Sequence, residues 1–146
     1  MDGLSSGVTI IALVPYAIIT YVQQKYTVLM FVLCLIGALL GYLYYNKKPA
    51  KVFMGDTGSL ALGGFVVSAA YMLKIPLFIP IVAFIYFIEV LSVIIQVTYY
   101  KKTKKRIFKM APIHHHFELS GWPETKVVSI FSIVTAVLCL IGMLAY

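Results

Sequence analysis

Residues Tyr26–Tyr45 read YTVLMFVLCLIGALLGYLYY, a run of 20 residues without a charged side chain. A helix needs about 20 predominantly apolar residues to cross the hydrocarbon core of a bilayer. Four further runs are also apolar, and two of them are short; they are Val8–Val22, Thr57–Leu73, Leu77–Tyr100 and Val127–Ala145. Short helices still span where flanking polar residues or local bilayer thinning help. The runs predict an all-α, polytopic integral membrane protein with about five transmembrane helices, forming one transmembrane domain over residues 1–146.

The composition agrees with a membrane protein and argues against a nucleic-acid partner. Of the 146 residues, 62% are hydrophobic and 12% are charged, whereas soluble domains average about a quarter charged residues. A soluble domain of this size could not bury so much apolar surface, so we expect membrane lipid to be its solvent. The net charge of +7 comes from basic residues in short loops between apolar runs, as in cytoplasmic loops of membrane proteins. Cys34 and Cys139 lie within apolar runs, and we interpret both as packing residues.

The basic residues predict the orientation. The connections at residues 23–25 and 74–76 are tight, so the helices that flank each connection form antiparallel hairpins. Loops 46–56 and 101–126 together carry ten basic residues, whereas the opposite side carries only Lys25 and Lys74. The positive-inside rule therefore places both long loops and the N-terminus in the cytoplasm and the C-terminus outside. The first six residues have no basic region, so we expect no removable signal peptide.

The first long loop ends in the polar stretch Val52–Ser59, VFMGDTGS. One interpretation is structural: Asp56, Thr57 or Ser59 caps the following helix by accepting hydrogen bonds from its free amides. The other is functional, because exposed amides at a helix N-terminus attract phosphate and a nearby carboxylate can hold Mg²⁺ against it. The two are compatible if Asp56 binds the metal while a hydroxyl caps the helix.

The second polar stretch, Ala111–Glu118, reads APIHHHFE. Three adjacent histidines cannot all face one point on a regular helix, and Pro112 disfavours helix before it, so we expect a loop. His114, His115 and His116 could bind a transition metal. They suit Mg²⁺ poorly, since that ion prefers oxygen ligands. They fit better as hydrogen-bond donors to phosphate or as proton carriers, and hydrogen bonding within the loop is the structural alternative.

Two further features lie in or next to the fourth apolar run. Glu89, Ser92 and Gln96 form one polar stripe on a helical face. A carboxyl in lipid is costly, so this face should point into a protein interior. Glu89 is then either a functional group or simply a protonated carboxyl that is hydrogen-bonded in a helix interface. The segment 103–110 mixes basic and apolar side chains, so it could lie among lipid headgroups and gather an anionic lipid substrate; an ordinary positive-inside loop is equally compatible.

These stretches resemble the signatures of the phospho-N-acetylmuramoyl-pentapeptide transferases, a family of the polyprenyl-phosphate N-acetylhexosamine-1-phosphate transferase (glycosyltransferase 4) superfamily. The similarity rests on FMGDTGSLALGG at residues 53–64, on APIHHHFE at residues 111–118 and on the spacing from Asn46 to Phe53. Residues 2–4 are similar to the end of the motif Asn-Leu-Thr-Asp-Gly-Leu-Asp-Gly-Leu. Family members have ten membrane helices, so we expect this chain to be the C-terminal half.

The resemblance implies an enzyme of peptidoglycan synthesis in the bacterial inner (plasma) membrane. It would transfer phospho-MurNAc-pentapeptide from UDP-MurNAc-pentapeptide to undecaprenyl phosphate with Mg²⁺, giving lipid I and UMP. By position in the motifs, Asp56 would be the Mg²⁺ ligand and a catalytic residue, together with the catalytic residues His114–His116. Asp2, Asn46 and Phe53 would form the uridine site, with Phe53 stacking on the base.

The resemblance also implies that part of the active site is absent from this chain. The family's Asp-Asp pair and essential lysines lie in the N-terminal half, so we expect a truncated chain that is inactive alone, with that half as its partner. Met1 stands where the family usually has leucine, as expected for a Leu-type codon read as a start or for a fragment. A homodimer is also open, but a second copy cannot supply the missing acids. The alternative from another functional class is a non-enzymatic transporter or channel subunit that uses Glu89 and its stripe.

Overall fold

The computed structural model describes residues 3–145, and all its regular structure is helical. The helices are α1 (Leu4–Val22), α2 (Tyr26–Asn46), α3 (Gly55–Met72), the 3₁₀ turn η1 (Pro76–Phe78), α4 (Ile79–Val82), α5 (Phe84–Thr103), α6 (Ile113–Glu118) and α7 (Glu124–Leu144). No strand occurs in these described residues, which confirms the all-α prediction.

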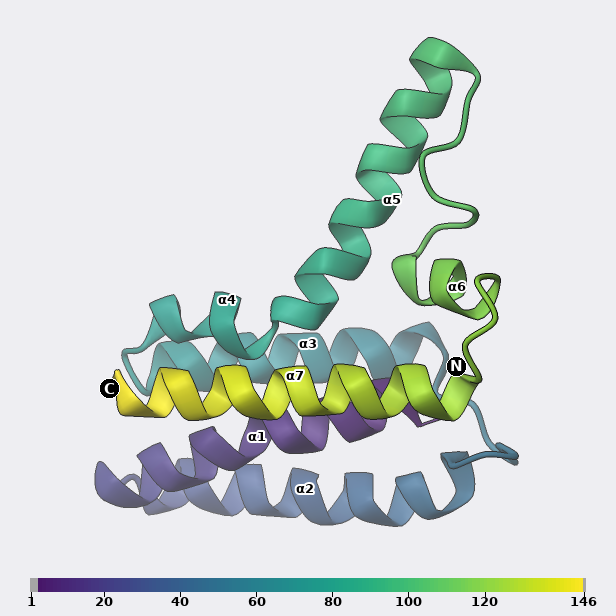
Figure 1. Cartoon of the computed structure of the whole chain (residues 1–146). Helices are drawn as coiled ribbons and strands as arrows, with labels where there is room; N and C mark the ends of the chain where they lie inside the picture. The colour runs from purple at the N-terminus through teal and green to yellow at the C-terminus, as the bar shows by residue number, and fades with distance from the viewer. Residues whose placement is uncertain (1–2, 146) are drawn as a thin grey trace.

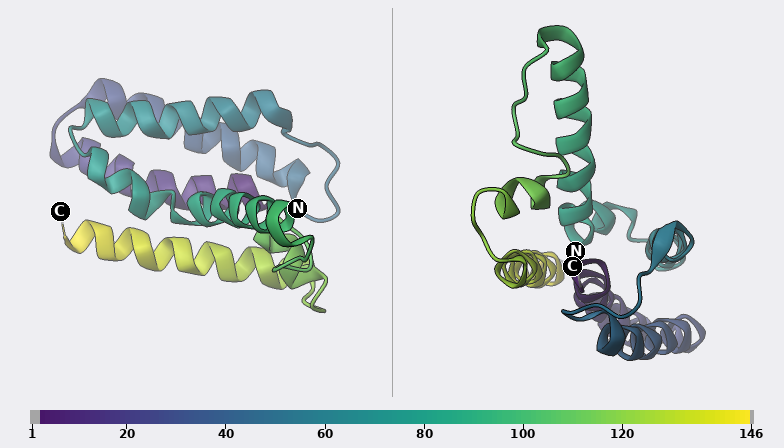
Figure 2. Two further views of the ribbon diagram at one scale, coloured as in Figure 1. Left: turned by 90° about the horizontal axis from the view of Figure 1, so that it is seen from above. Right: turned by 90° about the vertical axis from the view of Figure 1, so that its right-hand side faces the viewer.

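Four long helices, α1, α2, α3 and α7, lie side by side with their axes roughly aligned (Figures 1 and 2). Helix α1 contacts α2, α7 and α3 and is therefore the centre of the bundle. The two predicted hairpin turns meet at the end of the bundle that holds the C-terminus. There, Gln23 Nε2 donates a hydrogen bond to the Leu73 carbonyl at 3.1 Å, and Lys25 Nζ donates to the Met72 carbonyl.

The fourth predicted span is not one continuous helix, which corrects the expected run Leu77–Tyr100. Pro76 and Pro80 lie in the first turns of η1 and α4, because proline suits a helix start and disrupts a helix interior. Ala83, with φ −94° and ψ 14°, separates α4 from α5. Helix α5 then slants away from the bundle, and the chain returns alongside it to α6 (Figure 1).

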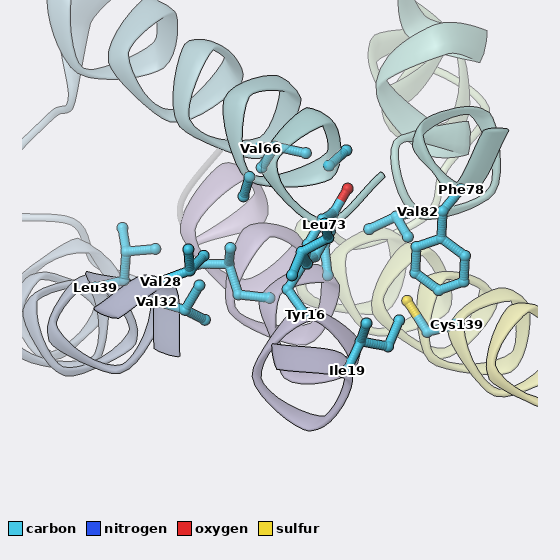
Figure 3. Packing of buried hydrophobic residues seen from close by; sticks show 14 residues of the cluster. Tyr16, Ile19, Val28, Val32, Leu39, Val66, Leu73, Phe78, Val82 and Cys139 are labelled. Carbon is cyan, nitrogen blue, oxygen red and sulfur yellow. The ribbon is translucent and has the colours of Figure 1, made fainter. Parts of the chain in front are cut away.

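The main hydrophobic core lies where α1 meets α2, α3, η1, α4 and α7. Figure 3 shows Tyr16 of α1 near its centre, with Leu73, just after α3, close by and Phe78 of η1 packed over Cys139 of α7. The Tyr16 and Phe78 rings meet edge to face with centroids 6.0 Å apart. A second cluster, made of Val8, Ile85, Val127 and Phe131, lies beneath α6.

The outer faces of the long helices are apolar, as a membrane-embedded bundle requires. Among the described residues, four helices, α1, α2, α5 and α7, are long and apolar enough to cross a bilayer. Helix α3 has 18 residues, but its polar first turn makes it less apolar than these four helices. By length and apolar composition, the described residues therefore support four of the five expected spans. Added Cβ atoms at Gly37 and Gly41 of α2 would meet nothing within 4 Å among the described residues. No neighbouring helix therefore packs closely on these two glycines within the described residues. Cys139 is buried as expected, whereas Cys34 faces outward.

Candidate active site

The two polar stretches lie at the same end of the bundle, opposite the end that holds the C-terminus (Figures 1 and 2). The α2–α3 loop carries one stretch and α6 carries the other. An ion pair connects the α2–α3 loop to the start of α7, the helix that follows α6. In this pair Lys48 Nζ lies 3.0 Å from Glu124 Oε2. The prediction that the two stretches lie at one end of the helices is therefore confirmed. Which side of a membrane this end faces stays a prediction.

Asn46, a predicted uridine-site residue, joins three segments at this end. Its Oδ1 accepts hydrogen bonds from the Gly3 amide at 3.1 Å and from Ser6 Oγ at 3.2 Å. Its Nδ2 donates to the Val52 carbonyl at 2.8 Å. Asn46 is only 5% exposed, and its side chain ties the start of α1 and Val52 of the α2–α3 loop to the end of α2. Gly3 has φ +75°, a conformation that glycine adopts without strain. The predicted Asp2 lies outside the described residues.

Phe53 lies in the same loop and is 75% exposed. Its aromatic ring is therefore available for stacking. A backbone hydrogen bond from the Lys51 amide to the Tyr45 carbonyl, 2.8 Å long, holds this loop against the end of α2. Phe53 and Asn46 thus belong to one short loop, with the buried amide holding the loop and the exposed ring at its surface.

Asp56 lies in the first turn of α3 and is exposed. The N-cap residue is Met54, and no side chain caps this helix; Ser59 Oγ instead donates to the Gly55 carbonyl at 3.0 Å. The capping interpretation of Asp56, Thr57 and Ser59 is therefore wrong. Asp56 forms no hydrogen bond or ion pair within residues 3–145, so its carboxylate stands beside helix amides that no side chain occupies.

The histidine segment forms a helix rather than the expected loop. His114, His115 and His116 all lie in α6, with Pro112 at its N-cap in extended conformation. The helix forms because Pro112 suits a helix start, and because the Ile113 amide finds a partner outside the helix in Ser92 Oγ at 3.1 Å. The expectation that the three rings cannot face one point remains valid, since each ring has a different partner.

Each imidazole is engaged through Nδ1. In His114, Nδ1 lies 2.9 Å from Glu89 Oε2, and in His115 it lies 2.7 Å from Glu118 Oε2. In His116, Nδ1 accepts the backbone amide of Lys109 at 3.1 Å. The partner of His115 is three residues away on the same helix, a spacing that sequence reasoning could have found. The partner of His114 comes from α5, 25 residues earlier, and no local signal points to it.

The polar stripe on α5 holds the returning chain. Gln96 Oε1 accepts the amides of Ile107 and Phe108 at 3.1 and 2.9 Å, and Gln96 Nε2 donates to the Phe108 carbonyl at 3.0 Å. Ser92 Oγ accepts the Ile113 amide, and Glu89 reaches His114. The prediction that this face points into protein is confirmed, because all three stripe residues bind the segment 107–114.

Aromatic packing fixes α6 from the other side. Phe117 stacks on Trp122 with ring centroids 5.0 Å apart and meets Phe131 of α7 edge to face at 6.2 Å. Lys126 Nζ lies 4.6 Å from the centre of the Trp122 ring. The histidine helix is thus held between the polar stripe of α5 and the aromatic rings of Trp122 and Phe131, and the Trp122 contribution had no signal in the motifs.

The described residues do not bring metal ligands together. Within residues 3–145, no group of three His, Cys, Asp or Glu side chains is arranged to hold a metal ion, so the transition-metal interpretation of the histidines finds no support in the geometry. A largely apolar cavity of about 400 Å³ lies between α1, α3, α4 and the start of α5. Ser59, three residues after Asp56, and Tyr86, three residues before Glu89, both line it.

Comparison with known proteins supports the motif resemblance. The sequence model of glycosyl transferase family 4 matches residues 1–74. Similar relatives are the phospho-N-acetylmuramoyl-pentapeptide-transferases of Clostridium botulinum (strain Eklund 17B / Type B) and Clostridium novyi (strain NT), at 59% and 57% identity over 145 residues. Each alignment covers 99% of this chain and 45% of the relative, so the chain spans less than half the length of these relatives. The matched half of the sequence shows that the chain belongs to glycosyl transferase family 4.

Proposed function

We propose that this chain forms part of a phospho-N-acetylmuramoyl-pentapeptide transferase of peptidoglycan synthesis. The reaction is transfer of phospho-MurNAc-pentapeptide from UDP-MurNAc-pentapeptide to undecaprenyl phosphate, with lipid I and UMP as products. The observation that carries the proposal is the placement of a free carboxylate, Asp56, and three imidazoles at one end of an apolar helical bundle. The identity to named transferases supports the same reaction.

Asp56 fits Mg²⁺ as one ligand of several. It is an exposed carboxylate, the ligand type that this ion prefers, and no described residue competes for it. Because Mg²⁺ keeps several waters and is commonly shared with substrate phosphates, a single protein carboxylate on this chain is compatible with such a site. The bound ion would neutralise charge on the pyrophosphate of the nucleotide substrate. The uncapped amides of α3 would assist by donating to a phosphate oxygen.

The histidines act on the phosphates in this proposal. Each ring has Nδ1 engaged by protein, so Nε2 is the nitrogen available to a substrate oxygen. Phe53 would stack on the uracil ring, since it is exposed on the loop that leads to Asp56. Asn46 is buried and holds that loop, so its contribution would be to shape the uridine site that includes Asp2.

The lipid substrate would approach from the membrane. The cavity between α1, α3 and α4 is largely apolar and begins one helical turn after Asp56, which supports a prenyl chain lying there with its phosphate near the α3 start. By the distribution of basic residues, the end that carries Asp56 and α6 would face the cytoplasm. The C-terminus would then lie outside the inner membrane.

We expect the isolated chain to be inactive and to need a second half that supplies further acids and cations. Phosphoryl transfer requires several charged groups around the pyrophosphate, and Asp56 is the only free carboxylate on the described part of α3 and its loop. The transporter alternative loses its main argument, because Glu89, Ser92 and Gln96 bind the segment 107–114.

The proposal is tested by co-expressing this chain with the segment of the C. botulinum relative that it does not match. Formation of lipid I from labelled UDP-MurNAc-pentapeptide is the measurement. We expect no product from this chain alone and product from the pair. Asp56→Asn should lower turnover by about 100-fold or more, because metal stabilisation of charge is worth several kcal/mol. Glu124→Gln makes the same chemical change at the carboxylate paired with Lys48, so it measures how far turnover depends on that ion pair rather than on a metal ligand. Normal turnover by Asp56→Asn would refute the metal role.

A further inference from the structure

The three histidines of α6 differ in which ring nitrogen carries a proton. A backbone amide is only a donor, so His116 Nδ1, which binds the Lys109 amide at 3.1 Å, must be the unprotonated nitrogen. The neutral His116 ring therefore carries its proton on Nε2. The partners of His114 and His115 are carboxylates, which are acceptors when ionised. Nδ1 of His116 thus faces a hydrogen-bond donor, whereas Nδ1 of His114 and of His115 faces a carboxylate.

The pair of His114 with Glu89 is the more constrained of the two carboxylate pairs. Its side chains are 16% and 14% exposed, whereas those of His115 and Glu118 are 37% and 30% exposed. Glu89 also comes from a different helix, and Ser92, one turn further along α5, binds the amide of Ile113 beside His114. One face of α5 therefore fixes both the backbone and the ring at this position.

An ionised Glu89 carboxylate has no proton to offer, so the proton in this contact is on His114 Nδ1. Nδ1–H then donates to Glu89 Oε2, and the lone pair of the neutral ring is on Nε2. No described residue binds Nε2 of His114. A carboxylate that orients a histidine through one nitrogen and leaves the other free is a known way to define a proton acceptor.

We propose that Glu89 is a positioning residue that holds His114 in the Nδ1–H tautomer, so that Nε2 accepts a proton or hydrogen bond from the substrate. His116, by contrast, presents Nε2–H as a fixed donor. Because residues two apart on a helix do not face each other, these two rings would contact different groups of the substrate. The tautomer assignment rests on the Glu89–His114 contact with Glu89 ionised, whereas its use in catalysis rests on the proposed function.

The tautomers can be measured on the full 146-residue chain in lipid nanodiscs with ¹⁵N-labelled histidine. Ring ¹⁵N chemical shifts distinguish a protonated from an unprotonated nitrogen at a pH where the rings are neutral. His114→Gln and His116→Gln assign the signals by deletion. We expect the wild-type His114 to be protonated on Nδ1 and His116 on Nε2. An Nε2–H tautomer for wild-type His114 would overturn the proposal.

Variants then test whether Glu89 causes the tautomer. Glu89→Leu removes the acceptor and should move His114 to the Nε2–H form, while the His116 signals stay unchanged and report an intact α6. Glu118→Leu is the matched control, because it should change His115 and leave His114 in the Nδ1–H form. Glu89→Gln retains a carbonyl acceptor and should restore much of the Nδ1–H form. His114 that stays protonated on Nδ1 in Glu89→Leu would show that Glu89 does not position it.

The catalytic consequence is measured with the co-expressed pair of segments. We expect Glu89→Leu to lower kcat by about 10- to 100-fold, the usual effect of losing a group that orients a functional histidine. KM for UDP-MurNAc-pentapeptide should change much less, and Glu89→Gln should recover part of the loss. A tautomer change in Glu89→Leu with unchanged kcat would overturn the catalytic role of His114 and not the positioning by Glu89. The two failures are therefore distinguishable.

Discussion

Replacement of Asn46 by alanine should destabilise the end of the bundle that carries the predicted active site. The side chain makes three hydrogen bonds, to the Gly3 amide, to Ser6 Oγ and to the Val52 carbonyl. Asn46 is 5% exposed and Ser6 is fully buried. Alanine leaves the buried Gly3 amide without this acceptor and without ready access to water. Ser6 Oγ retains a longer contact to the Gly3 carbonyl at 3.4 Å.

The expected loss follows from these three bonds. A net hydrogen bond is worth about 0.5–1.5 kcal/mol in soluble proteins and averages about 0.6 kcal/mol in a membrane protein. We therefore expect Asn46→Ala to lower the free energy of unfolding by about 2–4 kcal/mol. Asn46→Asp is the matched variant, because it keeps an acceptor for Gly3 and Ser6 but replaces the donor to Val52. It should cost about 1–2 kcal/mol, from one lost bond and repulsion between two oxygens.

The assay is reversible unfolding of the chain in mixed micelles by titration with SDS, combined with hydrogen–deuterium exchange. Asn46→Ala should increase exchange both at the start of α1 and in the α2–α3 loop. Asn46→Asp should increase it in the loop alone, because only the Val52 bond is lost. A loss below about 0.5 kcal/mol for Asn46→Ala, or the same exchange pattern in both variants, would refute the reasoning, since three buried bonds predict more.

Other contacts give further expectations. A Cβ added at Gly142 would lie 2.6 Å from Phe78 Cε2, so Gly142→Ala should destabilise the chain by about 1–3 kcal/mol through overpacking, measured by the same SDS titration. Gly41→Ala, where a Cβ meets nothing within 4 Å, is its control and should not destabilise the chain; an equal loss in both variants would contradict the packing argument. Gln96→Leu removes three bonds to the returning chain and should raise hydrogen exchange at Phe108, and unchanged exchange there would show that other contacts hold the segment.

The helices α1, α2, α3 and α7 follow from local properties of the sequence, whereas the break before α5 and the helix α6 do not. The 20 apolar residues at 26–45 predict α2, which the structure places at Tyr26–Asn46. The short connections at 23–25 and 74–76 force neighbouring helices to run antiparallel, so the two polar stretches return to one end (Figure 1). The motifs around Asp56 and the histidines also point to the family from the sequence alone. Each motif is one contiguous stretch, so it can be recognised without knowing which distant residues it contacts.

The partners of the polar side chains depend on the tertiary structure. Glu89 reads in the sequence as a carboxyl in an apolar run, and only the return of the chain along α5 brings His114 within 2.9 Å of it. Likewise, the histidines become helical because Ser92 supplies a partner for the Ile113 amide, and Asn46 is buried because α1 starts against the end of α2. Long apolar runs determine which segments avoid water. Hydrogen bonds between residues 25 to 43 positions apart, in contrast, form only when whole helices have packed against each other. For that physical reason, the sequence by itself determined the membrane helices and the family, and only the tertiary structure decided how each candidate site residue is held.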